Sequence, residues 1–132
     1  MAGPAVLPAQ ITIEDDLGRD VVFSHPPCRI VSLIPAVTEI VFALGAEGCL
    51  VGRSMYDDHP AGVASVPDVG QAIGANVEKV VARRPDLVVL IAGSDNARTV
   101  ELFERLGIAS LVFRLNRLPG LRDTIERMGR VL

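Results

Sequence analysis

The sequence has no basic surplus and no long hydrophobic run. Its 132 residues include 13 basic and 16 acidic side chains, which give a net charge of −3 at pH 7. A chain without a basic surplus has little to attract it to nucleic acid. Its longest apolar run, Leu87–Ala92, is far shorter than the roughly 18 residues of a membrane-spanning helix. Both absences argue against functions on nucleic acid or within a bilayer.

Cysteine and histidine are also scarce. Cys28 and Cys49 are too few for a disulfide scaffold, and they lack the C-x-x-C spacing of a zinc or redox site. The run Asp57-Asp58-His59 carries metal-ligand chemistry, but three adjacent residues do not converge on one ion without distant partners. The second histidine, His25, precedes the first core strand. We therefore expect no metal site.

The motifs of several catalytic classes are missing. We find no G-x-x-x-x-G-K-[ST] loop, no G-x-G-x-x-G after a strand, no G-x-S-x-G elbow and no H-E-x-x-H. No nucleophile stands in a recognisable pattern with a base, so we expect a protein that is not an enzyme. Residues 1–4 have neither the basic nor the apolar segment of a secretory signal, so the sequence itself contains none.

The sequence does contain ample material for one core, with 49% apolar and 22% charged residues. Alternating residues on both sides of the turn Asp15–Gly18 predict a β-hairpin of Ile11–Glu14 and Asp20–Phe23. Runs rich in β-branched residues then predict buried parallel strands. These strands are Arg29–Leu33, Leu50–Gly52, Asp86–Ala92 and Ala109–Phe113.

Helical spacing of apolar residues predicts a helix after each of three strands. The first begins at Pro35 and ends at Gly45, and the second begins after an Asn76 cap and ends before Pro85. In the third, Ser94 or Asp95 is the expected cap and Gly107 the end. Its expected buried face consists of Val100, Phe103 and Leu106.

A last helix is predicted over Leu118–Leu132, with no stop signal before the sequence ends. Its expected apolar side consists of Leu121, Ile125, Met128 and Val131 or Leu132. Strands that alternate with helices indicate an α/β, Rossmann-like fold of three layers with a mainly parallel sheet. Ligands of such sheets bind at the carboxyl ends of the strands. The loops at that edge are 34–35, 53–59, 91–96 and 114–116.

Short motifs follow one another along the chain in a fixed order. They are Arg29–Ile40, Leu44–Ala46, Val51–Gly52, Tyr56–Pro60, Val69–Gly70, Asn76–Val80, Arg84–Val88 and Leu106–Ile108. In order and spacing they resemble the vitamin B12 and iron-siderophore family of periplasmic binding proteins, the receptors of ABC importers. No single motif is specific, but their order across residues 11–132 is.

Proteins of this family have two α/β lobes joined by one long helix, with the ligand held in the cleft between them. The resemblance implies that residues 1–117 form the N-terminal lobe and that 118–132 begin the interlobe helix, with the C-terminal lobe absent. An isolated lobe is expected to bind ligand weakly or not at all. Its cleft surface would be exposed or covered by a second copy of the chain, as a homodimer.

The resemblance also implies ligand contacts. Pro35, Ala36 and Tyr56 match the positions where vitamin B12 binders of the family present a helix N-terminus and an aromatic ring to the corrin. Ordinary packing in a loop is the alternative for Tyr56. Ala72 and Ile91 stand where those binders have tryptophans, so a corrin ring would rest on aliphatic groups at these two positions.

Two charged residues have competing interpretations. The Arg53 guanidinium suits an anionic siderophore or a propionate, whereas the alternative is a solvated arginine at a strand end. Glu78 matches the family position whose carboxylate docks onto an arginine of the membrane permease. An acidic residue in the first turn of a helix is also favoured by the helix dipole without any partner.

Cys28 and Cys49 each directly precede a predicted strand, so we expect both at the sheet edge opposite the ligand loops. A disulfide between them would add about 3 kcal/mol of stability in an oxidising compartment. Two free, buried thiols are the alternative.

The sequence thus predicts the substrate-binding component of an ABC importer that delivers a corrinoid or an iron-siderophore to a permease. We expect it to be periplasmic, or extracellular and anchored to the membrane. No cofactor other than that ligand is expected. A receptor for haem or free metal ions is the alternative within the family, although free ions need several His and carboxylate ligands. From another class, a cytoplasmic Rossmann-like nucleotide-binding enzyme domain shares the parallel sheet.

Overall fold

A four-stranded parallel sheet forms the centre of the molecule. The structure is a computed structural model that describes residues 10–114 and 118–132. The strands follow the order β4-β3-β5-β6, and a separate antiparallel hairpin pairs β1 with β2. Their bounds are β1 Ile11–Glu14, β2 Asp20–Phe23, β3 Ile30–Ser32, β4 Leu50–Arg53, β5 Leu87–Ile91 and β6 Ser110–Phe113. The predicted hairpin and parallel strands are confirmed.

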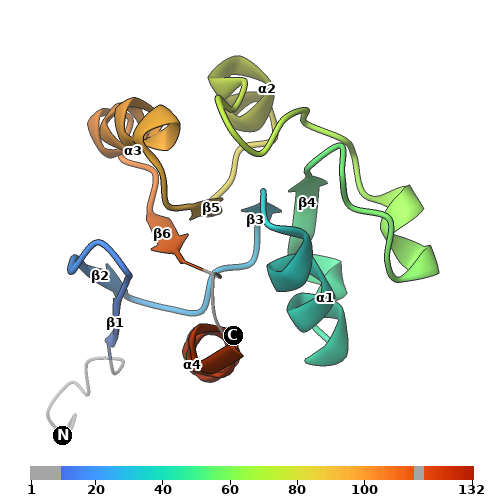
Figure 1. Cartoon of the computed structure of the whole chain (residues 1–132), viewed down its shortest axis with the longest axis horizontal. Coiled ribbons are helices and arrows are strands. Elements are labelled where there is room, and N and C mark those ends of the chain that lie inside the picture. The colour runs from blue at the N-terminus through green and yellow to red at the C-terminus, as the bar shows by residue number, and fades with distance from the viewer. Residues whose placement is uncertain (1–9, 115–117) are drawn as a thin grey trace, which may run out of the picture.

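Helices cover both faces of this sheet. Figure 1 shows α2 and α3 on one side of the strands and α1 and α4 on the other. The α-helices are α1 Pro35–Ala43, α2 Val77–Ala82, α3 Ser94–Arg105 and α4 Leu118–Val131, and two short 3₁₀ helices, η1 Glu47–Cys49 and η2 Ala61–Ser65, flank β4. The three-layer, Rossmann-like architecture expected from the alternation of strands and helices is therefore confirmed.

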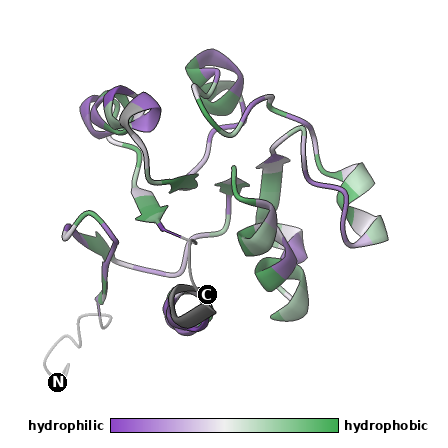
Figure 2. Cartoon of the chain, viewed as in Figure 1, coloured by the Kyte–Doolittle hydropathy of each residue, from purple (hydrophilic) through white to green (hydrophobic). Residues whose placement is uncertain are grey.

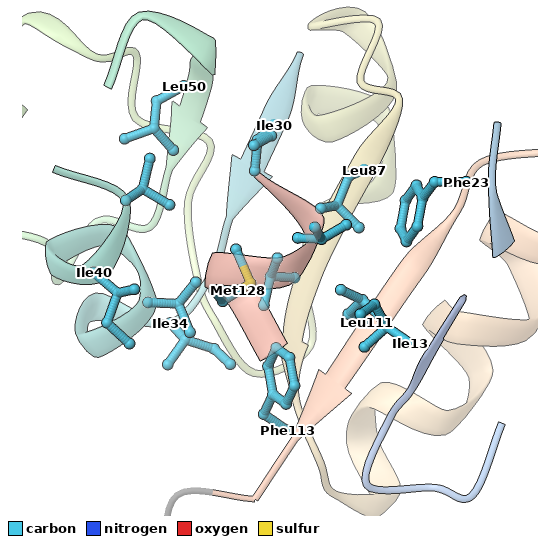
Figure 3. Close-up of a cluster of buried hydrophobic side chains, with 14 of the residues drawn as sticks. Ile13, Phe23, Ile30, Ile34, Ile40, Leu50, Leu87, Leu111, Phe113 and Met128 are labelled. Atoms are coloured by element: carbon cyan, nitrogen blue, oxygen red, sulfur yellow. The ribbon is translucent and has the colours of Figure 1, made fainter. Parts of the chain in front are cut away.

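Alternation along the strands divides the interior into two cores. In β3, Ile30 faces the cluster shared with α1, α4 and the hairpin, whereas Val31 faces the cluster shared with α2 and α3. Figure 3 shows Met128 of α4 inside the first cluster. Figure 2 shows apolar residues along β5 and β6 and mostly hydrophilic residues on α3. Each fully buried side chain such as Met128 or Phe103 contributes roughly 1.5–3 kcal/mol.

Helix ends follow the expected chemistry at several positions. Pro35 opens α1, and Gly45 follows the helix with a φ of 74° that a side chain would strain. Asn76 caps α2 by accepting a hydrogen bond of 3.1 Å from the backbone N–H of Lys79. Gly107 ends the next helix in the same left-handed conformation as Gly45. The predicted caps of α1 and α2 are confirmed.

The expectation for the start and the buried face of α3 is wrong in two details. The N-cap is Gly93, not Ser94 or Asp95, because the chain stays extended at Gly93 and turns directly into the helix. Leu106 is 52% exposed because it lies at the C-cap, beyond the last helical turn. The expected burial of Val100 and Phe103 is confirmed.

The buried face of α4 also differs from the expectation. Ile125 is 43% exposed, and the buried residues of the described part are Thr124, Arg127, Met128 and Val131. The physical reason is Arg127, whose guanidinium lies 4.8 Å from the centre of the Phe113 ring and binds Asp16 at 2.7 Å. It also donates to the carbonyl of Glu14. These contacts turn Ile125 outward, and Leu121 lies outside the described side chains.

The sheet order creates one point where the connections diverge. From β3 the chain passes through α1 to β4 on one side, and from β5 it passes through α3 to β6 on the other side. The neighbouring strands β3 and β5 therefore send their following loops apart. Open parallel sheets bind ligands in the crevice at such a point.

Candidate ligand site

A cavity of about 400 Å³ lies at the carboxyl ends of β3 and β5, where the connections diverge. Its lining residues are mainly apolar and come from three loops, the first residue of α1 and the end of β5. They are Leu33, Ile34, Pro35, Tyr56, Gln71, Ala72, Ile73 and Ile91. The structure thus brings together Pro35, Tyr56 and Ile91, which were predicted from the sequence as ligand residues. Tyr56 and Ile73 are 60% and 56% exposed, so the cavity has an apolar rim.

Tyr56 is held by the buried polar residues of its own loop. The hydroxyl of Ser54 accepts a hydrogen bond of 3.3 Å from the Tyr56 backbone N–H and donates one of 3.0 Å to the carboxylate of Asp57. Thr38 of α1 donates a bond of 2.7 Å to the other carboxylate oxygen. The position of the aromatic ring therefore depends on contacts beneath the cavity.

Asp57 is itself an unusual residue for an interior. Its side chain is 5% exposed, and burial raises the pKa of its carboxyl above the ordinary value. The hydrogen bonds from Thr38 and Ser54 oppose that rise, because they stabilise the ionised form. Ser32 extends the network with a contact of 2.8 Å to the Thr38 hydroxyl. The sequence did not single out this network.

Arg53 supports the same loop and does not line the cavity. Its Nε donates to the carbonyls of Val63 and Val66, at 3.0 and 2.9 Å. Its NH1 group donates to the carbonyls of Ser54 and Asp57. Four backbone carbonyls therefore bind Nε and NH1 of the guanidinium, which contradicts the interpretation of Arg53 as a solvated arginine at a strand end. The contact of Arg53 with a ligand stays a prediction.

The segment Gln71–Ile73 forms a wall of the cavity that sequence reasoning missed, apart from Ala72. It follows a stretch that pairs with the end of β4 through a parallel bridge between Arg53 and Asp68. The Met55 N–H donates a hydrogen bond of 2.8 Å to the Gly70 carbonyl and ties this stretch to the Tyr56 loop. The segment has no regular periodicity, so no pattern indicated its place.

Ala36 and Glu78 lie elsewhere. Ala36 is half-buried and packs against the first core rather than lining the cavity. Glu78 lies in the first turn of α2 with an exposed side chain. That position leaves it accessible and also fits the helix-dipole interpretation.

Both cysteines are free thiols in the structure, with Cys28 exposed and Cys49 half-buried. Cys28 contacts Asp86, which directly precedes β5, so it does lie at the edge opposite the cavity. Its Sγ donates to the Asp86 carboxylate at 3.5 Å, and this bond raises the pKa of the thiol. The alternative of two buried thiols is wrong for Cys28. The disulfide stays a prediction for thiol titration of unreduced protein.

Residues 10–114 and 118–132 lack two features that would point to other functions. No group of three or more His, Cys, Asp or Glu side chains in these ranges is arranged to hold a metal ion. None of the helices there combines the length and the apolar character needed to cross a bilayer.

Solved structures of similar proteins are consistent with this arrangement. The periplasmic vitamin B12-binding protein of Vibrio cholerae superposes with a TM-score of 0.71 and 30% identity, over 80% of this chain and 41% of that chain. A periplasmic heme-binding protein from Pseudomonas aeruginosa gives a TM-score of 0.72 and 28% identity, over 78% of this chain and 37% of that one.

Sequence comparison agrees with these superpositions. An uncharacterized ABC transporter substrate-binding lipoprotein of Bacillus subtilis is 41% identical over 87 residues, which cover 66% of this chain and 27% of that protein. The chain therefore spans between 27% and 41% of the length of these three relatives. Residues 30–132 match the periplasmic binding protein family along their whole length. The chain is a member of that family.

Proposed function

We propose that this chain forms the N-terminal lobe of a solute-binding protein that captures a metal chelate, and first of all a corrinoid, for an ABC importer. The observation that carries the proposal is the apolar cavity between the ends of β3 and β5, with Tyr56 at its rim. A cavity of about 400 Å³ lies within the usual range of ligand sites, and its open rim suits one face of a larger flat molecule.

The charge of the cavity favours a corrinoid over an anionic chelate. None of its lining residues carries a formal charge, and Gln71 and the Tyr56 hydroxyl supply its polar side-chain groups. The nearby guanidinium of Arg53 binds backbone carbonyls instead. A carboxylate that moves into such a cavity loses its hydration, and no charged partner there compensates for that loss. A ring with an uncharged edge, such as a corrinoid with carboxamide side chains, avoids that cost.

A second lobe would cover the other face of the ligand. The lengths of the relatives support this part of the proposal, since the chain spans less than half of each. In this interpretation residues 1–117 are the first lobe and 118–132 begin the helix that leads to the second. Where the second lobe is missing, a second copy of the chain would cover the apolar rim, and ultracentrifugation would detect that homodimer.

Glu78 is the proposed contact with the permease, and its exposure on α2 supports this role. Charge pairs at a rim set orientation and association rate more than affinity. Glu78→Arg should therefore impair uptake by cells and leave ligand affinity unchanged. Unchanged uptake would count against the assignment. Family membership and the lipoprotein relative support a place in the periplasm or on the outer face of the membrane.

The test is a binding titration of the complete gene product with cyanocobalamin, hemin and a ferric siderophore. Visible absorbance and calorimetry measure the binding. We expect saturable binding of cyanocobalamin that Ile91→Glu abolishes, because the new carboxylate lies in the cavity. Leu102→Glu, on the exposed face of α3, is the matched control. Preference for hemin would instead support the haem receptor. Binding of none of the three, or equal loss in both variants, would refute the proposal.

A further inference from the structure

Asn96 lies in the first turn of α3, behind the wall of the cavity. Its side chain is 2% exposed. Its Nδ2 donates hydrogen bonds to two backbone carbonyls, that of Ile91 at 2.9 Å and that of Ala72 at 3.3 Å. Both acceptor residues line the cavity. One buried amide therefore joins the end of β5 to the wall segment 71–73.

This amide makes a hydrogen bond within the wall segment itself, beyond the contacts of the preceding residues 68–70. Among the described residues, no other hydrogen bond reaches Gln71, Ala72 or Ile73. The side chains of Gln71 and Ile73 are exposed, and Ala72 packs only partly against the second core. Apolar packing thus holds the segment weakly, and its place beside the ligand depends on the Asn96 contact.

The orientation of the amide follows from its neighbours. A carbonyl oxygen accepts hydrogen bonds and cannot donate them, so both carbonyls must face Nδ2 rather than Oδ1 of Asn96. The Oδ1 atom is buried and has no hydrogen-bond partner in the described part of the chain. A buried acceptor without a partner lowers stability. The packing of α3 alone therefore does not account for an asparagine at this position.

We propose that Asn96 is a positioning residue of the ligand cavity, which holds the wall 71–73 against the end of β5. The inference rests on the proposed function for its ligand-binding part. Without the amide, the lobe stays folded, but the wall leaves its place for part of the time. The apparent affinity is then the intrinsic affinity multiplied by the fraction of molecules in which the wall is in place.

Two substitutions and a matched control test the proposal. Asn96→Asp keeps the size of the side chain but turns an oxygen toward the two carbonyls, and Asn96→Ala removes the contact without adding charge. Asn76→Asp makes the same chemical change at the N-cap of α2, where Oδ1 accepts from Lys79. Aspartate caps a helix as well as asparagine does, so this control should change nothing.

The measurements are the NMR backbone order parameters of residues 71–73 in this chain and the affinity of the complete gene product for cyanocobalamin, well below the melting temperature. In both Asn96 variants we expect order parameters below about 0.6 and an affinity about tenfold lower. In Asn76→Asp both should equal those of the unsubstituted protein.

Unchanged order parameters in the Asn96 variants would overturn the proposal, and so would loss of order with unchanged affinity. Unfolding of both Asn96 variants while Asn76→Asp folds would also overturn it, because Asn96 would then support the whole lobe. If the unsubstituted protein does not bind cyanocobalamin, the corrinoid assignment of the proposed function fails. The order parameters still decide in that case whether Asn96 holds the wall.

Discussion

The hydroxyl of Thr38, in the first turns of α1, donates a hydrogen bond of 2.7 Å to the buried carboxylate of Asp57, 19 residues further along the chain. This bond joins the helix that follows β3 to the loop that follows β4. Tyr56 directly precedes Asp57, so the bond also sets where the aromatic ring meets the cavity. A polar contact in the interior thus supports an apolar surface.

Thr38→Val keeps the shape of the side chain and removes the donor. The buried carboxylate then lacks one hydrogen bond, which should lower the free energy of unfolding by about 1–3 kcal/mol. Chemical denaturation measures the change. Thr12→Val, on the exposed side of β1, is the control and should stay within about 0.5 kcal/mol. Equal effects of the two substitutions would disprove the role of the Thr38 hydroxyl.

Asp57 should make stability depend on pH. Burial raises the pKa of its carboxyl in the folded chain, so folding favours the protonated form. Its stabilising contribution is full below the unfolded pKa, about 3.9, and is lost as the pH rises through the folded pKa. The unsubstituted protein should therefore lose stability relative to Asp57→Asn over that window. Denaturation of both at a series of pH values measures the difference, and a difference of opposite slope would contradict the assignment.

Arg53→Met should loosen the loop between β4 and η2. The substitution removes the charged donor from the carbonyls of Val63 and Val66, which costs about 1–3 kcal/mol of unfolding free energy. Arg98→Met, on the exposed surface of α3, removes the same charge without these bonds and should be nearly neutral. If both variants are equally stable in thermal denaturation, the hydrogen bonds of Arg53 do not stabilise this loop.

Arg127→Met tests how α4 is fixed to the hairpin. Methionine can still pack on Phe113, but Asp16 loses its partner at 2.7 Å, so we expect a loss of about 1–3 kcal/mol. Arg122→Met lies on the exposed side of the same helix and serves as the control. Calorimetric melting of both variants gives the comparison. A destabilisation no larger than that of the control would show that the ion pair does not hold the helix.

The sequence predicted the parts of the site that depend on local patterns. Pro35 follows one recognisable strand and Ile91 lies at the carboxyl end of another. Parallel strands end at one edge of the sheet, so both had to lie near each other. Tyr56 lies in the loop after the predicted strand Leu50–Gly52. The order of the family motifs carried the same information. These three residues do line one cavity.

The predictions that failed concern positions that depend on contacts between residues distant in the sequence. The wall 71–73 is irregular, and its position follows from the pairing of Asp68 with Arg53 and from the Asn96 amide. Ile125 has the right spacing for a buried face, but the binding of Arg127 to the hairpin decides which side of α4 packs inward. Periodicity measures the hydrophobic face of a helix and contains nothing about such partners.

The most direct test of the account is the affinity of the complete gene product for cyanocobalamin with alanine at Tyr56. The ring lies at the rim of the cavity, so Tyr56→Ala should weaken binding by about tenfold or more while the melting temperature stays unchanged. Met55→Ala is the control, because Met55 is 50% exposed in the same loop and does not line the cavity. If the unsubstituted protein binds cyanocobalamin and Tyr56→Ala binds it equally well, the assignment of this cavity as the ligand site is contradicted.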